Sequence, residues 1–202
     1  MMLDLDTVID RTGLQSFDLL AVRRAVPMAV TYATTFPDRV SHLILIDGWT
    51  NFADMVDSPG VQAMEALIDN DWTLFTETLA RVLVGIDDPR FADLLGEHIR
   101  ACAEPEAYRA FVVAEKRYDI APLLADVRAK TLVMHNNKNT WVPIRVGQKL
   151  AAAIPDSRFL AIDDMIYERV APLIVRFVGG TEMPERVKLG AFRTILFTDV
   201  EG

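Results

Sequence analysis

The chain of 202 residues has one cysteine, Cys102. A single cysteine cannot form a disulfide within the chain, so the core must hold the fold, and this usage is typical of a reducing compartment such as the cytoplasm. Cys102 shares one face of a predicted helix with Phe91, Leu94, Leu95 and Ile99. That pattern predicts a packed thiol rather than a reactive one.

Long apolar runs and positive charge are also scarce. No run approaches the roughly 18 residues that a transmembrane helix needs, and the acidic start Met-Met-Leu-Asp-Leu-Asp is not that of a signal peptide. The formal net charge is −8, and the basic pair Arg23-Arg24 is too short to form a patch that follows a phosphate backbone. We therefore expect a cytoplasmic protein that needs no cofactor and binds neither a membrane nor nucleic acid.

Residues 17–49 contain a predicted strand, a sharp turn, a helix and a second strand. Phe17–Val22 and Leu43–Ile46 are apolar runs of strand length. Pro27 suits the first turn of the helix between them, because the N–H that it lacks would have no partner there. Two buried strands joined through a helix form a parallel crossover. The stretch therefore predicts the spine of a parallel α/β sheet.

Further along the chain, helical periodicity gives way to two more strands. Residues 51–127 show little strand signal, and strand character returns at Leu132–His135 and Arg158–Ile162. Helices are predicted at 3–11, 61–68, 71–85, 89–103, 104–118, 142–154 and 166–178. The alternation predicts an α/β fold with about four parallel strands and flanking helices.

The spine resembles the nucleophile elbow of the α/β-hydrolase family, in which a strand leads through G-x-S-x-G into a helix. The sequence Pro37-Asp38-Arg39-Val40 matches the family pattern before the next strand. At the elbow, Ala21-Val22-Arg23-Arg24-Ala25 places Arg23 at the serine position, and alanines replace both glycines. The resemblance implies a partial hydrolase fold: 1–50 and 128–180 as its core, and 51–127 as a helical cap.

The family's catalytic triad consists of this serine, an acid and a histidine base. The acid and base positions also differ in this chain. Leu132–His135 resembles a strand of the family that leads into the motif H-G-x-x-D-x-x-x-P. The aspartate of this motif is the triad acid. Here His135 and Pro143 match, while Asn139 occupies the acid position and has no charge to stabilise an imidazolium. No histidine follows His135, so the base is absent from the turn at 161–165. The resemblance then implies a catalytically inactive module for ligand sensing, regulation or interaction.

A different set of polar groups supports an alternative. His135 is expected at the carboxyl end of its strand, where ligands of open α/β sheets bind. Candidates for lining a small-molecule pocket there are Arg23, Arg24, His135, Asn139, Asp163 and Asp164. They leave open an esterase-like hydrolase with a non-standard site, a structural role for His135, or a truncated product without independent function. His42 begins its strand and is expected on the opposite surface.

The C-terminal residues Gly190–Gly202 resemble a second family. Gly-Ala-Phe-Arg-Thr-Ile-Leu-Phe-Thr-Asp-Val-Glu-Gly is similar to R-T-x-L-F-T-D-[IV]-x-G, the first strand of a class III nucleotidyl cyclase domain. This resemblance implies a cyclase-fused protein, with 181–202 as a linker and the start of the cyclase strand. Asp199 would bind metal if that domain were complete. An unrelated hydrophobic strand is the simpler alternative.

Phe17–Val22 is also predicted to form an edge of the sheet, because the strands that precede it in the family have no counterpart in this sequence. The run is apolar on both faces and has no charge beyond Asp18. Exposed edges of this kind favour pairing with another strand. We therefore predict a homodimer through this strand, or an intramolecular arrangement in which Ile195–Val200 covers it.

Overall fold

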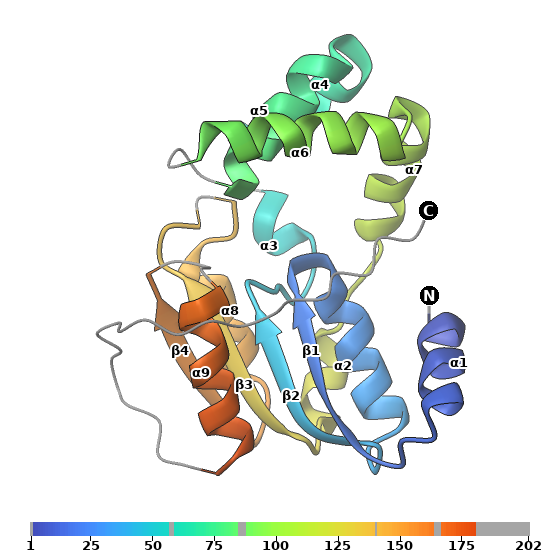
Figure 1. Ribbon diagram of the computed structural model, residues 1–202, viewed down its shortest axis with the longest axis vertical. Coiled ribbons are helices and arrows are strands. Elements are labelled where there is room, and N and C mark those ends of the chain that lie inside the picture. Colours follow the sequence, from blue (N-terminus) through green and yellow to red (C-terminus); the bar gives the residue numbers. More distant parts are fainter. Residues whose placement is uncertain (1, 57–58, 85–87, 140, 164–166, 181–202) are drawn as a thin grey trace. The chain divides into compact units, whose positions relative to one another are not determined.

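The computed structural model describes residues 2–56, 59–84, 88–139, 141–163 and 167–180 (Figure 1). Its sheet consists of β1 (Phe17–Val22), β2 (Val40–Ile46), β3 (Lys130–Asn136) and β4 (Ser157–Ile162). All neighbouring strands pair in parallel, in the order β1-β2-β3-β4. The predicted α/β fold with four parallel strands and flanking helices is confirmed.

The sheet lies in a compact unit formed by residues 1–50 and 119–199, as far as these are described. The helical elements of this unit are α1 (Met2–Thr12), η1 (Arg23–Ala25), α2 (Val26–Thr35), η2 (Ala121–Asp126), α8 (Ile144–Ala152) and α9 (Tyr167–Val178). Gly13 follows α1 with φ of +71°, a conformation that glycine adopts without strain. Pro27 lies in the first turn of α2, as predicted.

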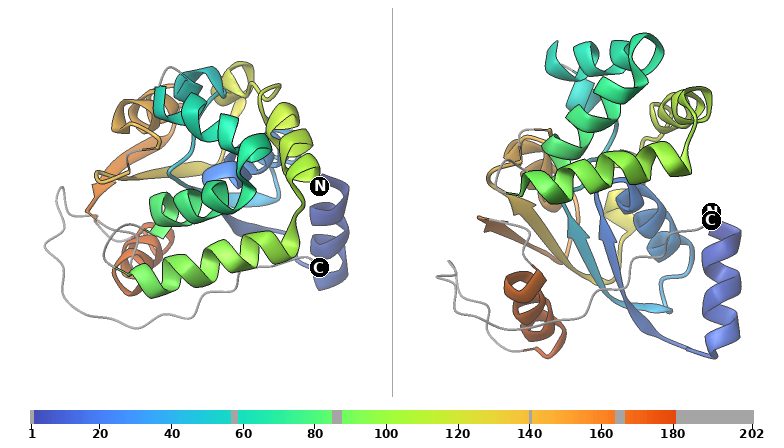
Figure 2. Two further views of the ribbon diagram at one scale, coloured as in Figure 1. Left: turned by 90° about the horizontal axis from the view of Figure 1, so that it is seen from above. Right: turned by 45° about the horizontal axis from the view of Figure 1, so that its top comes forward.

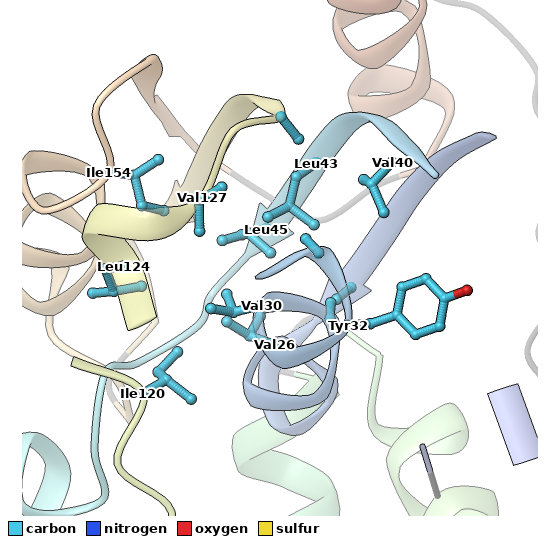
Figure 3. Close-up of a cluster of buried hydrophobic side chains, with 14 of the residues drawn as sticks. Val26, Val30, Tyr32, Val40, Leu43, Leu45, Ile120, Leu124, Val127 and Ile154 are labelled. Atoms are coloured by element: carbon cyan, nitrogen blue, oxygen red, sulfur yellow. The ribbon is translucent and has the colours of Figure 1, made fainter. Parts of the chain in front are cut away.

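Two hydrophobic clusters hold this unit together, one on each face of the sheet. Leu43 and Leu45 point from β2 toward Val26 and Val30 of α2, in the cluster drawn in Figure 3. Ile44 and the residues that alternate with it face the cluster around α9. Because both faces of β2 are buried, its sequence is a continuous apolar run rather than an alternating one. Each such buried side chain contributes about 1.5–3 kcal/mol through removal from water.

Residues 51–118 form the second compact unit, which is helical where it is described. Its helices are α3 (Ala53–Val56), α4 (Pro59–Asn70), α5 (Trp72–Val84), α6 (Pro89–Cys102) and α7 (Pro105–Glu115) (Figure 2). Asp88 caps α6 as its Oδ1 accepts from the Phe91 N–H at 2.9 Å. The role of this unit as a cap over an active site stays a prediction.

The predicted packing of Cys102 is wrong. Cys102 is exposed, with its Sγ 3.5 Å from His98 Nε2. Phe91 and Leu94, on the face that was expected to be buried, are 55% and 56% exposed. Helix α6 instead buries Ala92 and Gly96, because small side chains allow it to approach α5 closely.

Several sequence-based predictions fall outside the described residues. These are Asp164, the linker at 181–189, the strand Ile195–Val200 and the cyclase-like Asp199. The resemblance to a cyclase domain therefore stays a prediction. Within the described ranges, no helix combines the length and the apolar character needed to cross a membrane.

The strand β1 lies at one edge of the sheet, as expected. Its side chains alternate between exposed and partly buried positions along most of the strand, and Leu20 is 43% exposed. The homodimer that this edge suggests stays a prediction.

Candidate active site

Two strained turns lie side by side at the carboxyl ends of β1 and β2. Arg23 follows β1 with φ of +51°, and Asp47 follows β2 with φ of +52°. Among the described residues, these are the non-glycine positions with positive φ. Such conformations cost on the order of 1–3 kcal/mol and gather at functional sites. The sharp turn of the elbow is therefore present although both of its glycines are alanines.

Asp47 connects three neighbouring strands through its fully buried carboxylate. Its Oδ1 accepts a hydrogen bond from the Asn136 N–H at 2.8 Å and lies 3.7 Å from His135 Nδ1. Its Oδ2 lies 4.0 Å from Arg23 Nε. The backbone N–H of Asp47 donates to the Met134 carbonyl at 2.9 Å. The buried carboxylate thus lies at ion-pair distance from the guanidinium group of Arg23, without a hydrogen bond between Asp47 Oδ2 and Arg23.

His135 is held inside the protein rather than presented to a ligand. The side chain is fully buried, and Nε2 lies 2.8 Å from the Val142 carbonyl oxygen. Since a carbonyl oxygen only accepts, Nε2 carries a hydrogen. A Cβ atom at Gly147 would lie 2.6 Å from His135 Nδ1, so the ring fills the space beside α8. His135 is therefore a buried residue that is hydrogen-bonded to the loop after β3.

Asn139 organises the loop that follows β3. Its Oδ1 accepts hydrogen bonds from the N–H groups of Trp141 and Val142, each at 2.9 Å. An asparagine side chain in this arrangement stabilises a turn without needing charge. The same loop carries the Val142 carbonyl that binds His135. The oxygen of Asn139 therefore has a structural partner where the family resemblance placed a catalytic acid.

The remaining candidates lie outside the group around Asp47. Asp163 follows β4, is exposed, and accepts a hydrogen bond from Asn137 Nδ2 at 3.1 Å. The strands β1 and β4 are three spacings apart, roughly 14 Å, which separates Asp163 from Arg23. Arg24 is half-buried in η1. The structure therefore brings Arg23, His135 and the Asn139 loop together, and leaves Asp163 in a pair of its own.

Asp47 is the residue that sequence reasoning missed. Its signal was an acidic residue placed directly after the buried run Leu43–Ile46, at the ligand-binding edge of a parallel sheet. The described region holds four buried side-chain atoms at this edge that make no hydrogen bond: Asp47 Oδ2, Trp49 Nε1, His135 Nδ1 and Asn139 Nδ2. Buried polar atoms normally have partners, so this concentration distinguishes the edge from the rest of the core. No group of three potential metal ligands occurs among the described residues.

Solved structures share this architecture. A hydrolase from Oleispira antarctica superposes with a TM-score of 0.76 at 18% identity, covering 89% of this chain and 71% of that one. The enol-lactonase of Burkholderia xenovorans gives a TM-score of 0.71 at 15% identity, covering 87% and 70%. The chain has the α/β-hydrolase fold.

Curated relatives are similar along three quarters of the chain. The 2-hydroxy-6-oxo-6-phenylhexa-2,4-dienoate hydrolase of Burkholderia cepacia is 24% identical over 160 residues, which cover 75% of this chain and 56% of that protein. The hydrolase of the same name from Comamonas testosteroni is 25% identical over 161 residues, with the same coverage. The chain thus spans about half the length of these relatives. No family model matches the chain.

These relatives correct the interpretation of the chain as a catalytically inactive sensing module. The curated relatives are named as hydrolases, and the structural neighbours include an enol-lactonase and an esterase. The alternative, a hydrolase with a non-standard site, fits these findings better. The inactive interpretation rested on the altered serine, acid and base positions. The structure adds a further polar arrangement at the same ends of the strands, formed by Asp47 and the turn at Arg23.

Proposed function

We propose that the protein is a hydrolase of small carbonyl compounds that carry a carboxylate group. The observation that carries the proposal is the Arg23–Asp47 pair at the strained elbow. The relatives are named for hydrolysis of oxo-dienoates, compounds with a carboxylate at one end and a carbonyl farther along the chain. A cation fixed at the elbow suits the carboxylate end of such a substrate.

Arg23 would bind the substrate carboxylate. Its side chain is 27% exposed and lies beside the fully buried carboxylate of Asp47. An arginine has five N–H donors in a planar fork, so it can contact Asp47 and a substrate carboxylate at the same time. Bidentate binding of this kind is both strong and directional. Asp47 would act as a positioning residue that keeps the fork at the turn.

Water would attack the substrate carbonyl directly in this site. An arginine stays protonated and cannot act as the nucleophile, so no acyl-enzyme would form at residue 23. Asp163 supplies an exposed carboxylate at the end of β4, roughly 14 Å from β1. It would accept the proton as the water oxygen bonds to the carbonyl carbon. Collapse of the intermediate then breaks the scissile bond, and the leaving group takes up the proton that Asp163 accepted, which restores the carboxylate.

Steady-state kinetics separates these two roles. The substrates are 2-hydroxy-6-oxo-6-phenylhexa-2,4-dienoate and p-nitrophenyl butyrate, which has no carboxylate. Arg23→Met should raise KM for the dienoate about tenfold or more while leaving kcat and the ester reaction nearly unchanged. Asp163→Asn should lower kcat for both substrates by about 100-fold or more. Arg24→Met is the matched control, because it removes the same charge from the neighbouring residue of η1.

A fluorophosphonate probe for activated serines should not label the protein. The proposal fails if the wild-type chain turns over neither substrate, or if Arg23→Met and Asp163→Asn leave both kinetic constants unchanged. Labelling at a serine together with turnover would also contradict it, since that result requires a covalent route.

A further inference from the structure

A groove of about 410 Å³ lies where the strands of the sheet begin, at the side opposite to the candidate active site. Residues from three strands and from the end of α9 line it, including His42, Lys130, Thr131, Arg158 and Phe177. In Figure 1 these strand ends and the end of α9 lie at the lower side of the sheet. Its volume is that of a small-molecule site. The proposed hydrolase chemistry uses none of these residues.

The strand register places polar side chains in a row along this edge. Asp18 of β1 pairs with His42 of β2, and His42 pairs with Lys130 of β3. Arg158 of β4 pairs with Leu132, which lies two residues after Lys130 and therefore on the same face of β3. Farther along that face, the residues are apolar and belong to the cluster around α9. The row thus marks the point where a buried face becomes polar.

Two cations in the groove have no ion-pair partner within the described part of the chain. Lys130 and Arg158 are both exposed, and the acidic lining residue Asp156 forms no ion pair there either. With the Asp156 carboxylate in the same lining, the groove keeps a net positive charge, which a bound anion would balance. This positive charge is local to the groove, since the whole chain has a net charge of −8.

His42 and Phe177 form the less charged part of the groove. His42 Nδ1 lies 2.8 Å from Asp18 Oδ1, so this carboxylate fixes the orientation of the ring. The His42 ring also meets Phe177 edge to face, with centroids 5.5 Å apart. The Thr131 hydroxyl donates to the Ala129 carbonyl at 2.9 Å. Phe177 is only 9% exposed, so it presents a small part of its ring to the groove. Recognition of an anion therefore rests on Lys130 and Arg158.

We propose that this groove binds a small organic phosphate, with Lys130 and Arg158 on the phosphate group and Phe177 against the organic part. Arginine and lysine bind phosphate oxygens through charge-assisted hydrogen bonds. Free phosphate presents the same oxygens but has no group to contact Phe177. The six residue steps from Lys130 to Asn136 along β3 correspond to roughly 20 Å. The groove is therefore separate from the candidate active site.

Isothermal titration calorimetry on the full chain tests the site with phenyl phosphate and with inorganic phosphate. Phenyl phosphate should bind with one-to-one stoichiometry. Lys130→Met and Arg158→Met should each weaken it about tenfold or more. Arg90→Met removes a charge from an exposed residue of α6 and should leave the affinity unchanged, as should Arg23→Met at the candidate active site. Circular dichroism verifies that each variant is folded.

The proposal is overturned if neither probe binds at millimolar concentration, or if the double variant of Lys130 and Arg158 binds as tightly as the wild type. Weakening by Arg23→Met but not by Lys130→Met would assign the phosphate to the hydrolase site and also overturn it. Tighter binding of phenyl phosphate than of inorganic phosphate supports the organic ligand. Equal binding would show that Phe177 contributes nothing and that free phosphate is the ligand, which contradicts the organic part of the proposal.

Discussion

Gly147 in α8 permits the buried position of His135, and its replacement by alanine is a quantitative test of the site. The added Cβ would lie 2.6 Å from His135 Nδ1 and 3.1 Å from its Cγ, so the ring must move. The ring cannot move freely, because it is fully buried and its Nε2 is hydrogen-bonded to the Val142 carbonyl. We therefore expect Gly147→Ala to destabilise the fold around the candidate active site.

The size of the effect follows from three contributions. Overpacking a filled core costs about 1–3 kcal/mol. Displacing His135 from Val142 costs about 1–3 kcal/mol more for the buried groups that lose their hydrogen bond. Alanine in place of glycine within a helix returns about 1 kcal/mol. We expect the free energy of unfolding to fall by about 3 kcal/mol.

Urea denaturation followed by circular dichroism measures this change, with Gly96→Ala as the matched control. Gly96 is also a helical glycine, in α6, but a Cβ there would first meet the Thr76 carbonyl oxygen at 3.5 Å, an ordinary contact. That variant should be neutral or stabilised by up to about 1 kcal/mol. In a His135→Ala background, Gly147→Ala should lose most of its cost. The reasoning is refuted if Gly147→Ala is as stable as the wild type, or if its cost is the same in both backgrounds.

Three further predictions concern charge, pH and association. Asp47→Asn removes the buried charge but keeps an acceptor for the Asn136 N–H. It should lower the free energy of unfolding, measured in urea, by about 1–3 kcal/mol. An unchanged stability would contradict the role given to Asp47. Burial raises the pKa of Tyr32 above its usual value of 10.0, so its contribution to stability is complete below about pH 10 and is lost as pH rises through the folded-state pKa. Urea titrations from about pH 9 to pH 11 should therefore show a shallower decline for Tyr32→Phe than for the wild type, and equal slopes would refute this linkage. Light scattering should detect a homodimer that Leu20→Lys on the edge of β1 disrupts, whereas a wild-type monomer at high micromolar concentration would contradict this association.

Local sequence patterns were sufficient for the parallel sheet. Phe17–Val22 forms β1 with the predicted bounds, because an apolar run of that length followed by a helix has few other compact arrangements. The same patterns failed on α6, where several apolar side chains compete for the interior. The close packing of Ala92 and Gly96 against α5 determines which face of α6 is buried, and it leaves Cys102 exposed. The hydrophobic periodicity of one helix does not predict such a contact with another helix.

The candidate active site depended on tertiary structure to a greater degree. The sequence by itself determined which residue types stand at the strand ends, including an arginine where the related family has its serine. Only the folded sheet placed Asp47 between Arg23 and His135, and it joined Asp47 to Asn136 across 89 positions of sequence. The left-handed turn at Arg23 also needed the surrounding fold, because no glycine there favours it. Local propensity determines strands and helices, whereas strand register and the strain that packing supports determine which polar groups meet.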